Sequence, residues 1–355
     1  MFPVFARQEI FPSHAPLGIT PLAQAQLLAS LLEGRVAHQV SECAREGSLD
    51  LDLSELKLTA LPAALAHLPY LHCLDVNRNE LQMGALLESP LLHAGALPEL
   101  RSLSANDNAL VGALPEGLGS LAPCLEELSL AGNLITALPP AAGALGRLEW
   151  VSLASNRIRE LPGEVVGAWG CLRYLDLRNN LLTALPPELA RCATLEELHV
   201  SGNALTALPE AWAAPSRLAV LSAAGNALVE LPVGLDAATE LETVDFSGNK
   251  LTVLPGEVVQ AWVHLRELYI SANALGFLPE QLGQLQELEV LAAAGNQLTA
   301  LPPQMGNCTA LRELYLGGNK ALSALPEGSE KWTELQTLNL RLCKFKTLPL
   351  CVYAV

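Results

Sequence analysis

Serine, histidine and aspartate, the residue types of an activated nucleophile, occur at positions that could bring them together. His199 is expected near Asp176 and Ser222, and such a set can support hydrolysis if the three side chains meet. The serines, however, are expected on a flat, open and water-exposed sheet, without a strained turn and without oxyanion donors aimed at one point. We therefore predict no catalytic residues and no enzyme activity.

Metal and phosphate chemistry are not indicated either. The dipeptide Gly-Asn is frequent, but it is not followed by lysine and serine or threonine as in a phosphate-binding loop. The histidines are spread out and show no metal-ligand spacing with the cysteines: His14, His38, His67, His72, His93, His199 and His264. No metal and no cofactor are predicted.

One stretch, residues 172–186, recurs with changes from residue 48 onward and must build whatever surface the protein offers. It reads L-R-Y-L-D-L-R-N-N-L-L-T-A-L-P. Leu175 and Leu177 alternate with polar residues, which is the period of two of a half-buried strand. Leu182 and Leu185 return to the core. Pro186 then steers the chain away from the sheet, because proline fixes φ and lacks a backbone donor.

Asparagine fills the position at which each predicted strand ends. Its amide can satisfy backbone groups that the turn leaves unpaired, so stacked copies are expected to form a ladder. From Asn133 onward the copies are 23 or 24 residues apart, a period typical of solenoids. The ladder asparagines are Asn79, Asn108, Asn133, Asn156, Asn180, Asn203, Asn226, Asn249, Asn273, Asn296 and Asn319.

The unit resembles the typical class of the leucine-rich repeat family, with the pattern L-x-x-L-x-L-x-x-N-x-L-x-x-L-P over residues 48–349. A variant with Leu56 and another with Cys343 in the asparagine slot bring the total to thirteen units. The resemblance implies an α/β solenoid, a right-handed horseshoe with a parallel concave β-sheet. Its style is similar to cytoplasmic Leu-Pro-rich arrays, the Ras-group-related and Scribble-type leucine-rich repeat proteins, which implies protein recognition without catalysis.

Three segments are expected. Residues 1–21 contain four prolines and no periodicity, and should form an extended arm. Residues 22–47 have helical spacing and should cap the first unit of the repeat domain, residues 48–355. In that domain about six extra residues near 84–97 must bulge from the convex side or the edge. Only residues 350–355 remain to cover the last unit, so the C-terminal cap is weak or missing. This favours end-on contact with a partner, self-association, or a sequence that is a fragment.

Composition narrows the class of partner and the location. The formal charge of −16, from 21 basic and 37 acidic residues, opposes nucleic acid and anionic lipid. No apolar run approaches the roughly 20 residues that cross a bilayer, and no secretory signal is apparent. Scattered cysteines without cysteine-rich caps favour a reducing, cytoplasmic location, with an organelle or a cytoskeletal assembly still open: Cys43, Cys73, Cys124, Cys171, Cys192, Cys308, Cys343 and Cys351.

The outward-facing positions of the predicted strands form the candidate binding face. Many carry serine, alanine or glycine, which supply little binding energy, whereas aromatic residues and arginine are favoured at interface hot spots. The first group, the central patch, is Trp150, Tyr174, Asp176, Arg178, Glu197 and His199. The second, the tyrosine group, is Asp245, Tyr269 and Tyr315, beside Glu267 and Glu313. The alternative is that Trp150 and Tyr174 pack together on an idle face.

The flank of the central units is acidic, which could attract a basic segment of a partner or could simply be a solvated surface: Glu126, Glu127, Glu149, Glu196 and Glu197. We predict a scaffold or adaptor in signalling that binds a protein on its concave face. Two other functions fit the sequence. One is a permanent structural subunit docked through its ends, and the other is the regulatory repeat region of a longer signalling protein.

Overall fold

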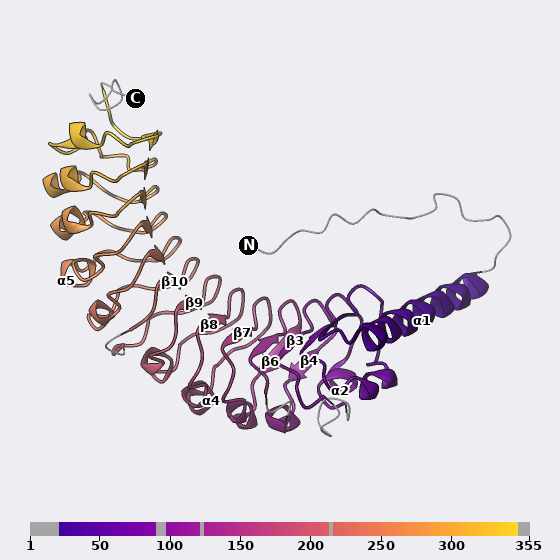
Figure 1. The fold of residues 1–355 in the computed structure, drawn as a ribbon. Helices are drawn as coiled ribbons and strands as arrows, with labels where there is room; N and C mark the ends of the chain where they lie inside the picture. The colour runs from indigo at the N-terminus through magenta and orange to yellow at the C-terminus, as the bar shows by residue number, and fades with distance from the viewer. Residues whose placement is uncertain (1–20, 90–96, 121–123, 213–215, 347–355) are drawn as a thin grey trace.

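The structure, a computed structural model, describes residues 21–89, 97–120, 124–212 and 216–346. The chain forms a curved solenoid in which short strands follow one another along the inner side of the bend (Figure 1). Helical segments such as α4 and α5 lie along the outer side. The predicted solenoid with a parallel sheet is confirmed. Residues 1–20 of the expected arm lie outside the described residues, and Pro21 already begins a helix.

One parallel sheet runs along the described repeats. Each of its thirteen strands is three residues long, and neighbours pair in register, so that Trp150, Tyr174 and Glu197 lie in one row. Strands this short are not stable alone, so each depends on its neighbours. The strands are β1 (Asp50–Asp52), β2 (Cys73–Asp75), β3 (Ser102–Ser104), β5 (Glu127–Ser129), β7 (Trp150–Ser152), β8 (Tyr174–Asp176), β9 (Glu197–His199), β10 (Val220–Ser222), β11 (Thr243–Asp245), β12 (Glu267–Tyr269), β13 (Val290–Ala292), β14 (Glu313–Tyr315) and β15 (Thr337–Asn339).

Short helices form the outer side of the solenoid, and many begin directly after a Leu-Pro dipeptide. Pro162, for example, has φ −64° and ψ 126° immediately before α4. Proline suits this position because its φ is fixed near that value and a helix start needs no N–H from it. The segments are α2 (Met83–Leu86), α4 (Gly163–Ala168), α5 (Gly256–Val259), and the 3-10 helices η1 (Ala63–His67), η2 (Glu116–Ser120), η3 (Pro140–Ala144), η4 (Leu189–Arg191), η5 (Leu235–Ala237), η6 (Glu280–Gln284), η7 (Pro303–Asn307) and η8 (Ser329–Lys331).

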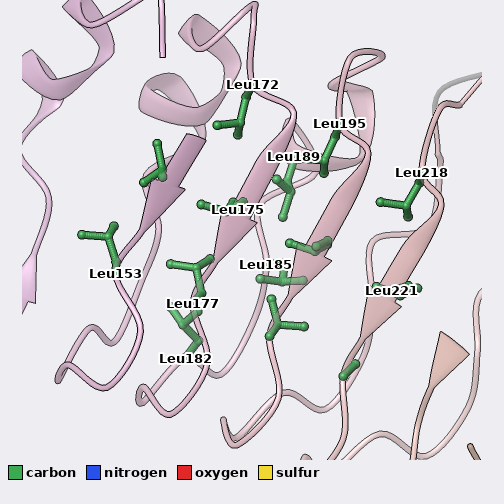
Figure 2. Packing of buried hydrophobic residues seen from close by; sticks show 14 of the residues in the cluster. Leu153, Leu172, Leu175, Leu177, Leu182, Leu185, Leu189, Leu195, Leu218 and Leu221 are labelled. Atoms are coloured by element: carbon green, nitrogen blue, oxygen red, sulfur yellow. The ribbon is translucent and has the colours of Figure 1, made fainter. Parts of the chain in front are cut away.

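Rows of leucines from successive repeats form one continuous core. Leu172, Leu175 and Leu177 are fully buried, and the equivalent leucines of the next repeats lie beside them (Figure 2). Each buried leucine is worth about 1.5–3 kcal/mol, so the core grows with every repeat. At the N-terminal end, α1 (Pro21–Glu46) adds Val40 and Cys43 to the same core. None of the described helices is long and apolar enough to span a bilayer.

Buried tryptophans tie neighbouring repeats together on the outer side. The indole N–H of Trp169 donates to the carbonyl of Ala142 (3.0 Å), and that of Trp332 donates to the carbonyl of Met305 (3.0 Å). Both side chains are 2 % exposed, and the indole N–H groups of these two tryptophans have their partners in the preceding repeat. These bonds are not apparent from the repeat pattern, because tryptophan occurs in only a few of its copies.

The irregular N-terminal repeats add a second, small sheet that the repeat pattern did not predict. β4 (Val111–Ala113) pairs in parallel with β6 (Leu134–Ala137), just after the ladder positions Asn108 and Asn133. The expected bulge near 84–97 begins with α2, and residues 90–96 lie outside the described residues. At the other end, β15 is less buried than β14, and residues 347–355, which include the expected weak cap, are also outside the description.

Candidate binding surface on the concave sheet

The ladder asparagines form a hydrogen-bonded row at the edge where the strands end. The Asn180 Oδ1 accepts from the N–H of Ile158 (3.0 Å), and its Nδ2 donates to the carbonyls of Leu153 (2.9 Å) and Leu177 (3.0 Å). Every other ladder amide likewise donates to carbonyls of its own repeat and of the preceding one. In the last slot the Cys343 thiol lies 3.2 Å from the carbonyl of Leu316. The row satisfies backbone groups and joins repeats.

The residue before each ladder asparagine sets the turn that leaves the strand, and its backbone is left-handed. Glycine occupies this position in several repeats, for example Gly248 with φ 66°. Ser155, Asn179 and Ala272 adopt the same conformation with φ 54°, 55° and 53°. For a residue with a Cβ atom, that conformation costs roughly 1–2 kcal/mol. The turn geometry is therefore kept even where the residue type opposes it.

The structure brings the central patch together on β7, β8 and β9. The rings of Trp150 and Tyr174 stack with their centroids 4.8 Å apart and an interplanar angle of 6°. The His199 ring lies 5.2 Å from that of Tyr174 at a tilt of 46°. Burial, followed by the nearby Asp176 carboxylate, raises the pKa of the Tyr174 phenol. The patch is an ordered strip of three rings crossing neighbouring strands.

Asp176, predicted to belong to the binding face, is largely buried, with a side chain that is only 4 % exposed. Its carboxylate accepts two hydrogen bonds from the Arg178 guanidinium, Nε to Oδ1 (2.9 Å) and Nη2 to Oδ2 (2.6 Å), and one from the Arg178 backbone N–H (3.0 Å). This bonding raises the pKa of Arg178. The arginine, 47 % exposed, is thus fixed in one orientation beside the rings, which is the geometry of a bidentate pair.

The three residue types of a hydrolase do not meet. His199 Nε2 lies 3.1 Å from the Glu197 carboxylate, while Asp176 is occupied by Arg178. The Ser222 hydroxyl shares a hydrogen bond of 2.8 Å with Ser201. Among the residues described, no group of three or more histidine, cysteine, aspartate or glutamate side chains could hold a metal ion. The arrangement suits recognition better than proton transfer.

The tyrosine group is less compact than the central patch. Tyr269 and Asp245 are neighbours in register, but Ala292 of β13 separates Tyr269 from Tyr315. Each phenol donates to a glutamate of its own strand, Tyr269 to Glu267 (3.1 Å) and Tyr315 to Glu313 (2.7 Å). Burial and the bond to Glu267 raise the pKa of Tyr269 to about 12. The group offers two separate phenols rather than one anchor.

The acidic flank is largely paired within the protein, which the sequence interpretation overlooked. Arg101 Nη1 lies 3.3 Å from Glu126, and Arg173 bridges Glu149 (3.8 Å) and Glu196 (3.0 Å). These arginines occupy the position immediately before the strand in their own repeats. Exposed pairs of this kind contribute about 0–1 kcal/mol each, but they reduce the field that a partner would meet.

A groove on the concave face, absent from the sequence predictions, lies beside the central patch. It has a volume of about 700 Å³, its floor includes Ser102, Ser104 and Ser129, and Trp150 and Glu127 line it. Asn77 and Asn106 also line the groove, and Asn77 Oδ1 accepts from the Ser104 hydroxyl (2.8 Å), as Asn106 Oδ1 does from that of Ser129 (2.6 Å). The signal was present in the sequence as two consecutive repeats with serines at concave positions, followed by a repeat with a tryptophan.

Comparison with known proteins agrees with this architecture. The family described as "Leucine rich repeat" matches residues 146–205, 170–228 and 239–298. Leucine-rich repeat-containing protein 58 of Mus musculus is 40 % identical over 120 residues, 32 % of this chain and 31 % of that protein. The matched stretch thus spans about a third of the curated relative.

Solved structures extend the likeness to most of the repeats. A leucine-rich repeat protein of Leptospira interrogans is 28 % identical with a TM-score of 0.53, covering 86 % of this chain and 93 % of that one. The ectodomain of an Arabidopsis thaliana membrane receptor kinase, in complex with Casparian strip integrity factor 2, is 25 % identical with a TM-score of 0.62, covering 82 % of this chain and 38 % of that one. With its repeated unit and its parallel concave sheet, the chain belongs to the leucine-rich repeat family.

Proposed function

We propose that this protein is a non-enzymatic scaffold or adaptor that holds a partner protein on the concave face of its sheet. The leucine-rich repeat fold is typical of protein-protein interaction modules, and its curvature gives an extended concave surface. The observation that carries the proposal is the central patch. On a face floored mainly by small side chains, Trp150, Tyr174 and the bidentate-held Arg178 stand together.

The side chains of the central patch are already held in fixed conformations, and this favours binding. A free arginine side chain loses rotamer freedom when a partner immobilises it, which costs about 0.5–1.5 kcal/mol. The Asp176 carboxylate already fixes Arg178, and Tyr174 already fixes the indole of Trp150. Aromatic and arginine side chains of this kind are the usual hot spots of protein interfaces. The Arabidopsis ectodomain, whose structure contains a bound factor, supports the same use of the fold.

Two measurements test the proposal. Size-exclusion chromatography with light scattering gives the oligomeric state, and affinity capture from native extract then compares the protein with a Trp150→Ala, Arg178→Ala double variant. A Phe277→Ala, Arg266→Ala variant is the matched control, since it removes one exposed aromatic ring and one exposed arginine outside the concave strand positions. We expect a monomer that loses its captured proteins only in the first variant. An oligomer whose capture ignores both variants would indicate a structural subunit instead.

A further inference from the structure

The groove beside the central patch and the hollow next to it are together lined by more acidic than basic side chains. The hollow has a volume of about 480 Å³ and shares Asp75, Asn77 and Asn106 with the groove. The single basic side chain in the two linings, Arg78, already pairs with Glu55 (2.9 Å) and lies 3.8 Å from Asp107. The two hollows are lined by five carboxylates, those of Asp52, Glu55, Asp75, Asp107 and Glu127. Carboxylates therefore outnumber basic groups, and the local field favours a cation.

The serine hydroxyl groups on the floor of the groove have their hydrogens engaged. The Ser102 hydroxyl donates to Glu127 (2.8 Å), as those of Ser104 and Ser129 do to Asn77 and Asn106, which also line the groove. With their hydrogens committed, these three hydroxyl groups present only oxygen lone pairs to an incoming group. A ligand rich in N–H donors matches these hydroxyl oxygens, whereas a carboxylate or phosphate finds no donor among the three hydroxyl groups.

Trp150 closes the groove with one face of its indole. Tyr174 covers the other face in the parallel stack, so the remaining face is turned toward β5, where Glu127 is the register neighbour of Trp150. The hydrogen bond from Ser102 draws the Glu127 carboxylate toward β3. An aromatic face and a carboxylate thus flank one end of the groove, the surroundings in which a planar cation is stabilised by both ring and charge.

We propose that this groove binds an extended, arginine-containing segment of a partner protein, with one guanidinium between the indole of Trp150 and the carboxylate of Glu127. The proposal rests on the proposed function and adds the chemistry of the partner. Arginine fits better than lysine because its planar fork can stack on the indole and bond the carboxylate at the same time. The small serine floor lets the partner backbone approach the sheet closely.

The Cys73 thiol at the far end of the groove is consistent with this field. Burial raises its pKa to about 12, and the carboxylates of Asp50 and Glu127 contribute to the shift. Asp50 and Glu127 come from β1 and β5, on either side of the strand that carries Cys73. Asp50, Cys73 and Glu127 thus lie in one register row across the sheet.

Labelled peptides test the proposal directly. We would measure by fluorescence anisotropy the binding of a fluorescein-labelled peptide of alternating arginine and serine, with lysine and glutamate versions beside it. The arginine peptide should bind best. Its affinity should fall at least about fivefold in Trp150→Ala and in Glu127→Gln. Glu242→Gln is the control, because Glu242 is an exposed glutamate immediately before β11, outside both candidate groups and the groove lining, and it should leave the affinity within about twofold.

Trp150 provides a local readout. It is the half-exposed tryptophan of the five, the other four being buried, so acrylamide quenching reports mainly on its indole. The bound arginine peptide should protect this fluorescence in the unmodified protein and in Glu242→Gln. Glu127→Gln replaces an exposed carboxylate by an amide of the same shape, so it keeps the test valid if Trp150→Ala folds poorly.

Several results would overturn the groove assignment: no binding of the arginine peptide, equal binding of the glutamate peptide, or equal losses of affinity in Glu127→Gln and Glu242→Gln. If capture of partner proteins is lost in the Trp150→Ala, Arg178→Ala variant but is unchanged in Glu127→Gln, the proposed binding on the concave face would hold and the arginine-containing partner would be wrong. If capture is unchanged in all of these variants, both proposals would be wrong.

Discussion

The ladder edge and the concave face come from the same repeat, yet their side chains are used differently. At the edge, asparagine recurs, and its amide forms hydrogen bonds with backbone groups, as that of Asn180 does. On the face, adjacent slots hold tryptophan, tyrosine, serine or glutamate, and bonds such as that of Arg178 with Asp176 orient side chains toward solvent. Substitutions at the edge should therefore change stability, and those on the face should change binding.

The largest expected effect is at the edge. Asn180→Ala removes one acceptor and the Nδ2 donors from a site that is 5 % exposed, leaving the Ile158 N–H and the Leu153 carbonyl without their partner. We expect a loss of about 1–3 kcal/mol in the free energy of unfolding, measured by urea denaturation. Asn203→Ala, at a half-buried site, should cost less. Equal and negligible losses at both positions would contradict the ladder.

Next in size is a change on the face that should spare the fold. Trp150→Ala should weaken partner binding by more than about 1 kcal/mol, because the indole is the largest ring of the patch and is partly exposed. Loss of the stack with Tyr174 should lower the unfolding free energy by only about 0.5–1.5 kcal/mol. Calorimetry of binding and of unfolding on the same sample separates the two quantities. A Trp150→Ala variant that is strongly destabilised, but binds the partner with unchanged affinity when folded, would contradict the distinction between edge and face.

A smaller gain is expected at the turn before the ladder. Ala272→Gly should raise the thermal midpoint, since removing the Cβ relieves roughly 1–2 kcal/mol of left-handed strain while glycine costs about 0.5–1 kcal/mol in entropy. The reverse change, Gly248→Ala, should lower the midpoint. Its new Cβ would lie 3.5 Å from Gly225, an ordinary contact, so the backbone conformation alone is tested. Binding should be unaffected by either.

The smallest expected effect is a pH dependence of stability that arises from the phenol of Tyr269 in the tyrosine group. Burial and the bond to Glu267 raise the pKa of Tyr269 to about 12, so the folded state retains the phenol proton more tightly than the unfolded chain. The resulting stabilisation is complete below the ordinary tyrosine pKa of about 10 and is lost as pH rises through about 12. Absorbance titration should show this phenol ionising late, and earlier in Glu267→Gln. Identical titrations would refute the coupling.

Much of the fold could be predicted from sequence because each repeat encodes it locally. The spacing of Leu175, Leu177 and Leu182 fixes which side chains enter the core, and the asparagine slot fixes where the strand must end. Register then follows from repetition, which is why Trp150, Tyr174 and His199 could be expected within reach of one another. Backbone periodicity is sufficient for these predictions.

Features that depend on side-chain reach or on irregular repeats could not be predicted in the same way. The burial of Asp176 follows from the conformation of Arg178, which no spacing reveals. The pairing of Arg101 and Arg173 with the flank depends on contacts between repeats. The β4–β6 pair arises where the repeat length departs from its regular value. The groove exists because three serine side chains are too short to fill the space above the strands.

The ladder also determines how the solenoid comes apart. Each amide bonds two consecutive repeats, so the opening of one unit removes partners from the next, as in a row of coupled two-state elements. A strong array of this kind melts in one cooperative step. Weakening a central link such as Asn180 should allow the two halves to melt separately, so that one calorimetric transition becomes two.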